Sequence, residues 1–332
     1  MSTQFEHPGM ELAIMSRWYV VSRAIHTIAR LGIADHMSLS PIPCEQIAKN
    51  SETVPTLLRR LLCFLSDYGV FERHGDAFAL TPLSLPLQSD APNSLRDVLC
   101  MVDEDWWQSF GCMDKMLKSG RPGYEERHGA PFFEHLGKHP EKQANFDRGM
   151  AKLSDYDDTA IADSVDISRF KTIADIGGGR GGLTRALAKK NHDVTITLFD
   201  TPQVINPLDP AQFPKNVQFL SGNFFETLPQ ADAYIYKGVL HDFNDADMRK
   251  ILSNCARQMP ASATLLIAEQ VMPDSSSPHP NKTMDMVMMV LLGGRQRTLS
   301  EWQSVVEPLG FVFITALPTP SLFRVMEFKR KP

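Results

Sequence analysis

Cysteine is scarce in this chain and shows no ligand-like spacing. Five cysteines occur among 332 residues, and no two of them form a C-x-x-C pair. Disulfide frameworks need an even, regularly spaced set, and structural zinc sites need paired cysteines. The sequence therefore predicts no disulfides and no metal site, and it favours a reducing, cytoplasmic setting. The cysteines are Cys44, Cys63, Cys100, Cys112 and Cys255.

Long apolar runs and an excess of positive charge are also missing. The longest apolar run, Met286 to Leu292, is far too short to span a bilayer. The N-terminal ten residues, MSTQFEHPGM, lack the apolar core and cleavage site of a secretory signal. Lys and Arg number 34 against 39 acidic residues, a net charge of -5, whereas a general nucleic-acid binder needs a basic face. We expect a protein that binds neither membrane nor nucleic acid.

What remains is the composition of a globular protein long enough for two domains. Hydrophobic residues make up 43% and charged residues 22% of the chain, and no internal repeat or low-complexity tract interrupts it. Apolar spacing within residues 11–36 predicts a helix that ends at Gly32. Two more helices are expected over 45–49 and 54–68, followed by two strands, 70–73 and 78–80, around the turn HGDA. Helices followed by a two-stranded wing are typical of a winged-helix domain, which we place at residues 1–93.

A winged-helix domain can bind DNA or pair subunits. The first hundred residues carry slightly more acidic than basic side chains, and the expected recognition helix offers little beyond Arg59 and Arg60. A DNA reader needs positive charge there. We therefore favour dimerisation and keep a DNA-binding ligand sensor as an alternative.

Beyond a helical section at 94–154, the chain alternates regularly between strands and helices. Strands are expected at 172–176, 194–199, 217–221, 233–237 and 264–269, with a final pair at 311–316 and 322–329. This alternation predicts an α/β fold with a Rossmann-like, doubly wound, mostly parallel sheet over 155–332. Ligands of such sheets bind at the carboxyl ends of the strands.

The stretch IADIGGGRGG, residues 173–182, is typical of a strand end, a sharp turn and the start of a helix. Glycines such as Gly177 and Gly179 allow the backbone to turn with positive φ and to press close to a ligand. The next strand ends in Asp200, whose carboxylate can bind the two hydroxyls of a ribose. These features predict a nucleotide-type pocket, although a tight turn without any ligand gives the same pattern.

The nature of the ligand depends on Asp175. A dinucleotide site brings a pyrophosphate to this turn, and a carboxylate at the strand end would repel it. S-adenosylmethionine carries an ammonium and a sulfonium and no phosphate, so a carboxylate suits it. The order D-x-G-x-G-x-G therefore favours a methyl-donor site over NAD.

Polar residues at the other strand ends should meet in the same crevice. Asn223 and Phe224 follow the third strand, and Lys237 ends the fourth. His241, shortly after Lys237, and Glu269, at the end of the fifth strand, are a plausible general base and its orienting carboxylate. Alternatively, His241 with Asp242 only caps the helix expected from residue 245 to 259.

Aromatic and methionine side chains outside the crevice can line an apolar pocket for a substrate. The same stripes also fit ordinary core packing, or a helix packed at a dimer interface. The candidates are Trp107, Phe146, Met150, Met284 and Met288.

Taken together, these motifs resemble the family of S-adenosylmethionine-dependent O-methyltransferases that includes plant caffeate and isoflavone methyltransferases, acetylserotonin methyltransferase and bacterial polyketide methyltransferases. The likeness covers nearly the whole chain. It extends from the winged domain through PFFEHL, DIGGGRGG, FDTPQVI, SGNFF, YKGVLHDFND, LLIAEQVMPD and GGRQRT.

The resemblance implies a homodimeric enzyme of secondary metabolism that transfers a methyl group to a hydroxyl of an aromatic or polyketide-like small molecule and releases S-adenosylhomocysteine. The glycine turn and Asp200 would hold the donor, and Asn223, Phe224 and Lys237 would surround its adenine. His241 would be the general base, flanked by Glu269.

Two positions depart from the family pattern. Asn223 stands where relatives have Asp, and an amide oxygen can still accept a hydrogen bond from adenine. Gln296, in GGRQRT, stands where many relatives place a second carboxylate beside the base, and a neutral amide stabilises an imidazolium less than an anion would. The second departure leaves a non-methylating reaction of the same fold, such as a rearrangement, cyclisation or decarboxylation, as an alternative.

Overall fold

The computed structural model describes residues 8–331, which divide into two compact units. One unit comprises the residues up to Asp103 together with Glu141–Leu153, and the other comprises Glu104–Pro140 and Ser154 onward. The middle section of the chain is thus shared between the units, and the long helix α10 (Pro140–Ser164) runs through both. None of the described helices has the length and apolar character needed to cross a membrane.

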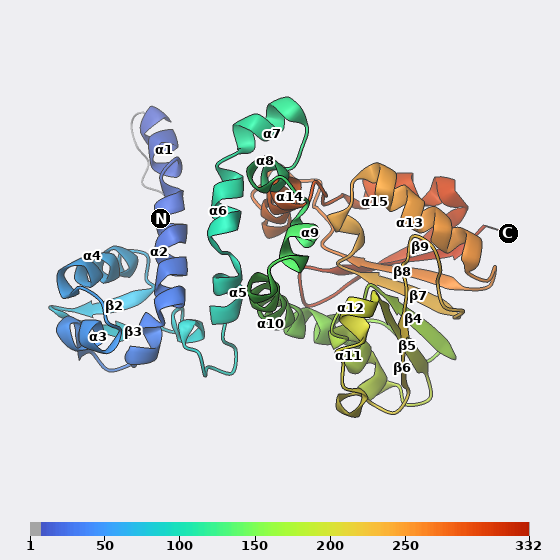
Figure 1. The fold of residues 1–332 in the computed structure, drawn as a ribbon, viewed down its shortest axis with the longest axis horizontal. Helices are drawn as coiled ribbons and strands as arrows, with labels where there is room; N and C mark the ends of the chain where they lie inside the picture. Colours follow the sequence, from blue (N-terminus) through green and yellow to red (C-terminus); the bar gives the residue numbers. More distant parts are fainter. Residues whose placement is uncertain (1–7, 332) are drawn as a thin grey trace. The chain divides into compact units, whose positions relative to one another are not determined.

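The N-terminal unit is the winged fold that the sequence predicts. Its small antiparallel sheet has the order β1-β3-β2, and helices α2, α3 and α4 pack on it through a shared apolar core (Figure 1). The elements are α1 (Pro8–Met15), α2 (Trp18–Leu31), β1 (Ile42–Pro43), α3 (Cys44–Asn50), α4 (Pro55–Ser66), β2 (Phe71–His74), β3 (Ala77–Leu80) and α5 (Arg96–Met101).

The helical spacing expected to end at Gly32 does end there, but the expectation of one uninterrupted helix is wrong, because α1 and α2 divide it. The chain breaks between α1 and α2, where the Ser16 hydroxyl donates to the Ala13 carbonyl at 2.8 Å. Gly32 then ends α2 in the left-handed conformation at φ 64°, and the 3-10 helix Ile33–His36 follows. Apolar spacing remains in register across the first break, so periodicity alone did not reveal it.

The second unit carries a seven-stranded sheet of order β6-β5-β4-β7-β8-β10-β9 (Figure 1). β4 through β8 are parallel, whereas β10 runs antiparallel between β8 and β9. The strands are β4 (Thr172–Ile176), β5 (Thr195–Asp200), β6 (Val217–Ser221), β7 (Ala233–Lys237), β8 (Thr264–Glu269), β9 (Phe311–Pro318) and β10 (Arg324–Arg330). The mostly parallel sheet is confirmed, and its order reverses at β4 and β7, where a ligand crevice is expected.

Helices cover both faces of this sheet. Successive strand residues alternate between two cores: Ile173 packs in a cluster with α11 (Gly182–Lys190) and the end of α10, whereas Ala174 packs in a cluster with α13 (Asp245–Gln258) and α15 (Leu299–Val306). Between these helices lie the short α12 (Pro202–Ile205) and α14 (Pro280–Leu291). The helices of these three layers cover the faces of the sheet, and the carboxyl ends of the strands are where a ligand is expected.

A helical section belongs to the same unit and packs on α14. It consists of α6 (Glu104–Phe110), α7 (Met113–Ser119), α8 (Gly123–His128) and α9 (Phe132–Gly137). Helices α6 and α8 contact each other and α14. At the tightest point, a Cβ on Gly123 would lie 2.6 Å from the Ser109 carbonyl oxygen, so the packing requires glycine.

Candidate functional site

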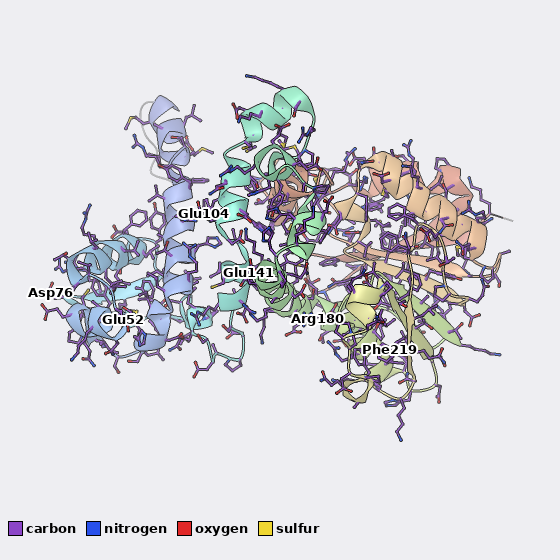
Figure 2. All side chains as sticks on the ribbon, viewed as in Figure 1. Glu52, Asp76, Glu104, Glu141, Arg180 and Phe219 are labelled. Atoms are coloured by element: carbon purple, nitrogen blue, oxygen red, sulfur yellow. The ribbon has the colours of Figure 1, made fainter. Side chains whose placement is uncertain are left out.

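The glycine turn after β4 is held against β5 by its own backbone. Gly177 and Gly179 have φ of 69° and 57°, as the sequence predicts for a turn that only glycine adopts without strain. The Gly177 N–H donates to the Phe199 carbonyl at 2.8 Å, and the Gly179 N–H donates to Asp200 Oδ2 at 2.9 Å. The ends of β4 and β5 therefore form one bare backbone surface with the Asp200 carboxylate at its edge. Arg180, labelled in Figure 2, follows this turn.

Asp175 lies beneath the turn rather than on its surface. Its side chain is 1% exposed, and Oδ2 accepts a hydrogen bond from the Thr184 hydroxyl at 2.6 Å. Burial raises the pKa of Asp175 to about 7, Thr184 lowers it in part, and the carboxylate of Asp158 raises it further. A buried carboxylate with this pKa is poised to ionise when positive charge arrives above it.

Lys237, at the end of β7, pairs with a carboxylate of helix α10 that the sequence did not indicate. Its Nζ lies 3.0 Å from Asp158 Oδ1 and donates to the Ser154 hydroxyl at 3.1 Å, both on α10. The ammonium also lies 5.4 Å from the centroid of the Phe323 ring. Asp158 was not predicted, because a carboxylate on a helix preceding the sheet carries no local signal of its partner.

Asn223 shapes the turn after β6. Its Oδ1 accepts from the Phe225 N–H at 3.0 Å, and its Nδ2 donates to Glu226 Oε1 at 3.1 Å. An aspartate here would be repelled by the Glu226 carboxylate, whereas the amide of Asn223 donates a hydrogen bond to it. Phe224 packs edge-on against Phe243 and reaches the glycine turn, because a Cβ on Gly177 would lie 3.7 Å from its ring.

His241 sits between two carboxylates, one at each ring nitrogen. Nδ1 lies 3.0 Å from Glu269 Oε2, and Nε2 lies 3.3 Å from Asp242 Oδ1. Glu269 is fully buried, and its Oε1 also accepts from the His241 backbone N–H at 3.2 Å. The alternative in which His241 and Asp242 cap α13 is wrong, because Asn244 accepts from the first N–H groups of that helix.

The two carboxylates set the proton affinity of this histidine. Burial by itself lowers the pKa of His241, but Glu269 and then Asp242 outweigh it and hold the pKa well above the usual histidine range. The two carboxylates therefore favour the imidazolium over the neutral ring. Asp242 is a site residue that sequence reasoning had treated only as a cap, although its place beside His241 was a usable signal.

Gln296 completes the surroundings of His241. Its side-chain amide lies 2.8 Å from His241 Nδ1, and its backbone N–H donates to Asp285 of α14 at 2.7 Å. The amide atom placed there is Nε2, so a proton on Nδ1 shared with Glu269 requires the amide to be turned until its oxygen faces the ring and accepts. A Cβ on Gly294 would lie 2.0 Å from the His241 carbonyl oxygen, so this loop touches the backbone of His241 itself.

The five pocket candidates fall into different units. Trp107 on α6, and Met284 and Met288 on α14, belong to the second unit, where these two helices pack together. Met288 is 8% exposed, so it also serves the core. Phe146 and Met150 belong to the segment 141–153 of the first unit. Their part in a pocket stays a prediction.

Comparison with known proteins agrees with this geometry. Residues 110–312 match the O-methyltransferase domain, and residues 14–89 match the O-methyltransferase dimerisation domain. The chain belongs to the O-methyltransferase family. Its mixed α/β fold, its class as a methyltransferase and its use of S-adenosylmethionine as the donor follow from this membership, and the family resemblance seen in the sequence is confirmed.

Similar proteins act on aromatic compounds. The chain is 34% identical to the phenazine O-methyltransferase PhzM of Lysobacter antibioticus over 93% of this chain and 92% of that protein. The crystal structure of LaPhzM matches with a TM-score of 0.87 at 33% identity, covering 97% and 99% of the two chains. The structure of NcsB1 from neocarzinostatin biosynthesis, with S-adenosylmethionine and 2-hydroxy-5-methyl naphthoic acid, matches with a TM-score of 0.80 at 28% identity over 93% and 96%.

The residues at the strand ends of this methyltransferase could hold its donor. The glycine turn carries no side chain that would block a ligand, and a Cβ on Gly178 would lie 2.4 Å from Leu198, which shows how closely the backbone is packed. Asp200 stands at the edge for a ribose diol, and the buried Asp175 suits a cation.

Proposed function

We propose that this enzyme methylates a hydroxyl group of an aromatic or polyketide-like small molecule and that His241 is the general base. The observation that carries the proposal is the placement of a buried imidazole between Glu269 and Asp242, 3.0 and 3.3 Å away. It lies at the carboxyl ends of β7 and β8, and β7 is the sheet neighbour of β4, whose end forms the glycine turn. The aromatic acceptors of PhzM and NcsB1 support the acceptor class.

The donor site that we propose uses the residues at the strand ends. Asp200 would bind the ribose hydroxyls, Phe224 and Asn223 would contact the adenine, and Lys237 would lie beside it. Asp175, Gly177 and Gly179 would support the methionine portion through charge and backbone. Bound there, S-adenosylmethionine supplies an electrophilic methyl group on a positively charged sulfur.

Glu269 and Asp242 prepare His241 to accept the acceptor's proton. Glu269 holds the Nδ1–H tautomer and leaves Nε2 to take the proton, and Asp242 stabilises the imidazolium that results. A phenol of pKa about 10 exceeds an ordinary histidine of about 6.5 by about 3.5 units. The raised pKa of His241 narrows this gap, so that proton transfer during attack costs less than it would with an unpaired imidazole.

The raised pKa also has a cost. His241 must lose a proton before it can act, so we infer that activity increases with pH until the imidazolium has titrated. Gln296 adds a neutral contact to Nδ1 and keeps the pKa lower than a third carboxylate would. We propose that Gln296 positions the ring rather than ionising with it.

We further propose a homodimer formed through residues 1–93, with 94–154 contributing to the acceptor pocket and 155–332 holding the donor. The match to a dimerisation domain supports the first part. So do the exposed apolar residues in the first turn of α2, where Trp18, Tyr19 and Val20 are 57%, 64% and 41% exposed. Apolar surface of this kind is typical of an interface.

The test is donor binding followed by product release. The purified chain is titrated with S-adenosylmethionine and with NAD by calorimetry, and a panel of phenols and hydroxynaphthoic acids is then screened for S-adenosylhomocysteine. We expect donor binding without NAD binding, and release that depends on a hydroxyl. Conversion of an acceptor without S-adenosylhomocysteine would instead identify a non-methylating enzyme, and failure to bind the donor would reject the proposal.

A further inference from the structure

Two histidines and an aspartate meet in the helical section of the second unit. They are Asp105 on α6, His128 at the end of α8 and His135 on α9. One ligand atom from each, a carboxylate oxygen and two imidazole nitrogens, lies within 4.8 Å of the others. Glu104, labelled in Figure 2, marks the start of α6 next to this group.

The contacts within the cluster centre on Asp105. The Nε2 of His135 lies 3.5 Å from Asp105 Oδ2, and the Nε2 of His128 lies 3.4 Å from the Asp105 carbonyl oxygen. Both distances exceed an ordinary N–H···O hydrogen bond of about 2.9 Å. The carboxylate and the His135 ring are each 15% exposed, so the cluster is shielded yet still open to a small solute.

Neighbouring rings hold the two imidazoles in place. Tyr124, which is 1% exposed, packs against His128 and His135 with centroid distances of 4.4 and 5.6 Å. His139 also packs against His135, with a centroid distance of 4.4 Å. These ring contacts restrict the orientations of the two imidazoles, which favours a preformed site.

We propose that Asp105, His128 and His135 bind a divalent transition-metal ion, with zinc as the best match. Imidazole nitrogen and carboxylate oxygen are favourable ligands for zinc, and three protein ligands leave a fourth position for water. Zinc–ligand bonds of about 2.1 Å place tetrahedral ligands about 3.4 Å apart. The ligand atoms of the cluster lie within 4.8 Å of one another, so side-chain rotations would bring them to this spacing.

Such an ion would cross-link α6, α8 and α9, next to α14. The absence of paired cysteines, on which the sequence prediction of no metal depended, does not bear on a site of this composition. The three ligands come from separate helices, so no local motif announces them. The ion would join the three helices and take no part in methyl transfer. It binds only neutral imidazoles, so acid releases it.

The experiment uses the full chain after treatment with a chelator. Zn²⁺ is titrated by calorimetry, and Co²⁺ is titrated while its visible absorption is recorded, since that absorption reports the coordination number and the ligand type. We expect one ion per chain, with weaker binding at pH 5 than at pH 7.5. The variants Asp105→Asn, His128→Gln and His135→Gln should each weaken binding at least about tenfold.

His192→Gln is the matched control, because His192 is an exposed histidine in the turn before β5, and we expect it to bind the metal as the unchanged chain does. Cooperative thermal unfolding and titration with S-adenosylmethionine verify that each variant is folded. The proposal is overturned if the unchanged chain binds neither ion, or if the three variants bind as tightly as His192→Gln. These readouts do not depend on methyl transfer, so the metal site and the proposed function can fail separately.

Discussion

Glu269 contacts His241 twice, through the backbone N–H at 3.2 Å and through ring Nδ1 at 3.0 Å. The first contact fixes the position of His241, and the second places a fully buried carboxylate at Nδ1, where it favours a proton. The position and the proton affinity of the proposed base therefore both depend on Glu269.

Replacing Glu269 should change the pH profile and not only the rate. In Glu269→Gln, the largest influence that raises the pKa of His241 is gone, so the acid limb of the kcat profile should move to lower pH. We expect kcat at its plateau to fall at least about tenfold, because the imidazolium is less stabilised. The measurement is kcat from pH 5.5 to 9. An acid limb that stays in place would show that His241 does not control it.

Removing the base itself should separate chemistry from binding. His241→Ala should lower turnover at least about a hundredfold and leave the affinity for S-adenosylmethionine nearly unchanged. Steady-state kinetics and calorimetry measure the two quantities, and His192→Ala, an exposed site, serves as the control. Equal turnover in both variants would remove His241 as the base.

Introducing a carboxylate at position 296 should move the acid limb of the pH profile in the opposite direction to Glu269→Gln. In Gln296→Glu, a further anion beside Nδ1 would raise the pKa of His241, so the acid limb should move to higher pH. The new charge lies at a fully buried position, so we also expect a lower Tm at pH 8. Gln296→Met, uncharged and similar in size, controls for packing. If Gln296→Glu and Gln296→Met share one pH profile, the electrostatic role assigned to this position is incorrect.

The ionised form of Asp175 should lower the stability of the fold, while its negative charge should favour binding of the donor. Its pKa is raised from 3.8 to about 7 in the folded chain, so folding favours the protonated form, and this residue's contribution to stability falls as pH rises from about 4 to 7. The shift corresponds to about 4 kcal/mol at most. Asp175→Asn removes the carboxylate and with it the cost of ionising this buried group. The Tm of the variant should therefore exceed that of the unchanged chain at pH 8 but not at pH 4.

The same variant lacks the buried negative charge that favours a cationic ligand. We expect Asp175→Asn to bind S-adenosylmethionine about tenfold more weakly at pH 8, as measured by calorimetry. Thr184→Val provides the comparison, because it removes the hydrogen bond to Asp175 and keeps the carboxylate. Donor affinity unchanged by Asp175→Asn would show that this charge is not felt at the ligand.

The sheet could be predicted from the sequence almost to the residue. β4, β7 and β8 have the predicted bounds because strands buried on both faces give continuous apolar segments. β6 also has the predicted bounds, although it lies at the edge of the sheet and is only partly buried. His241 and Glu269 followed from the same pattern, since parallel strands end at one edge. Asp158 could not be foreseen, because its partner Lys237 lies 79 residues away and only the packing of α10 brings the two together at 3.0 Å.

The placement of β10 has a consequence for shortened chains. β8 is buried along its whole length, and its outer edge is covered only by the antiparallel register that runs from Arg324 opposite Glu269 to Lys329 opposite Thr264. A chain that stops before Arg324 would expose the unpaired N–H and C=O groups of an apolar strand, which other molecules can extend. Such truncations should therefore aggregate rather than merely lose activity.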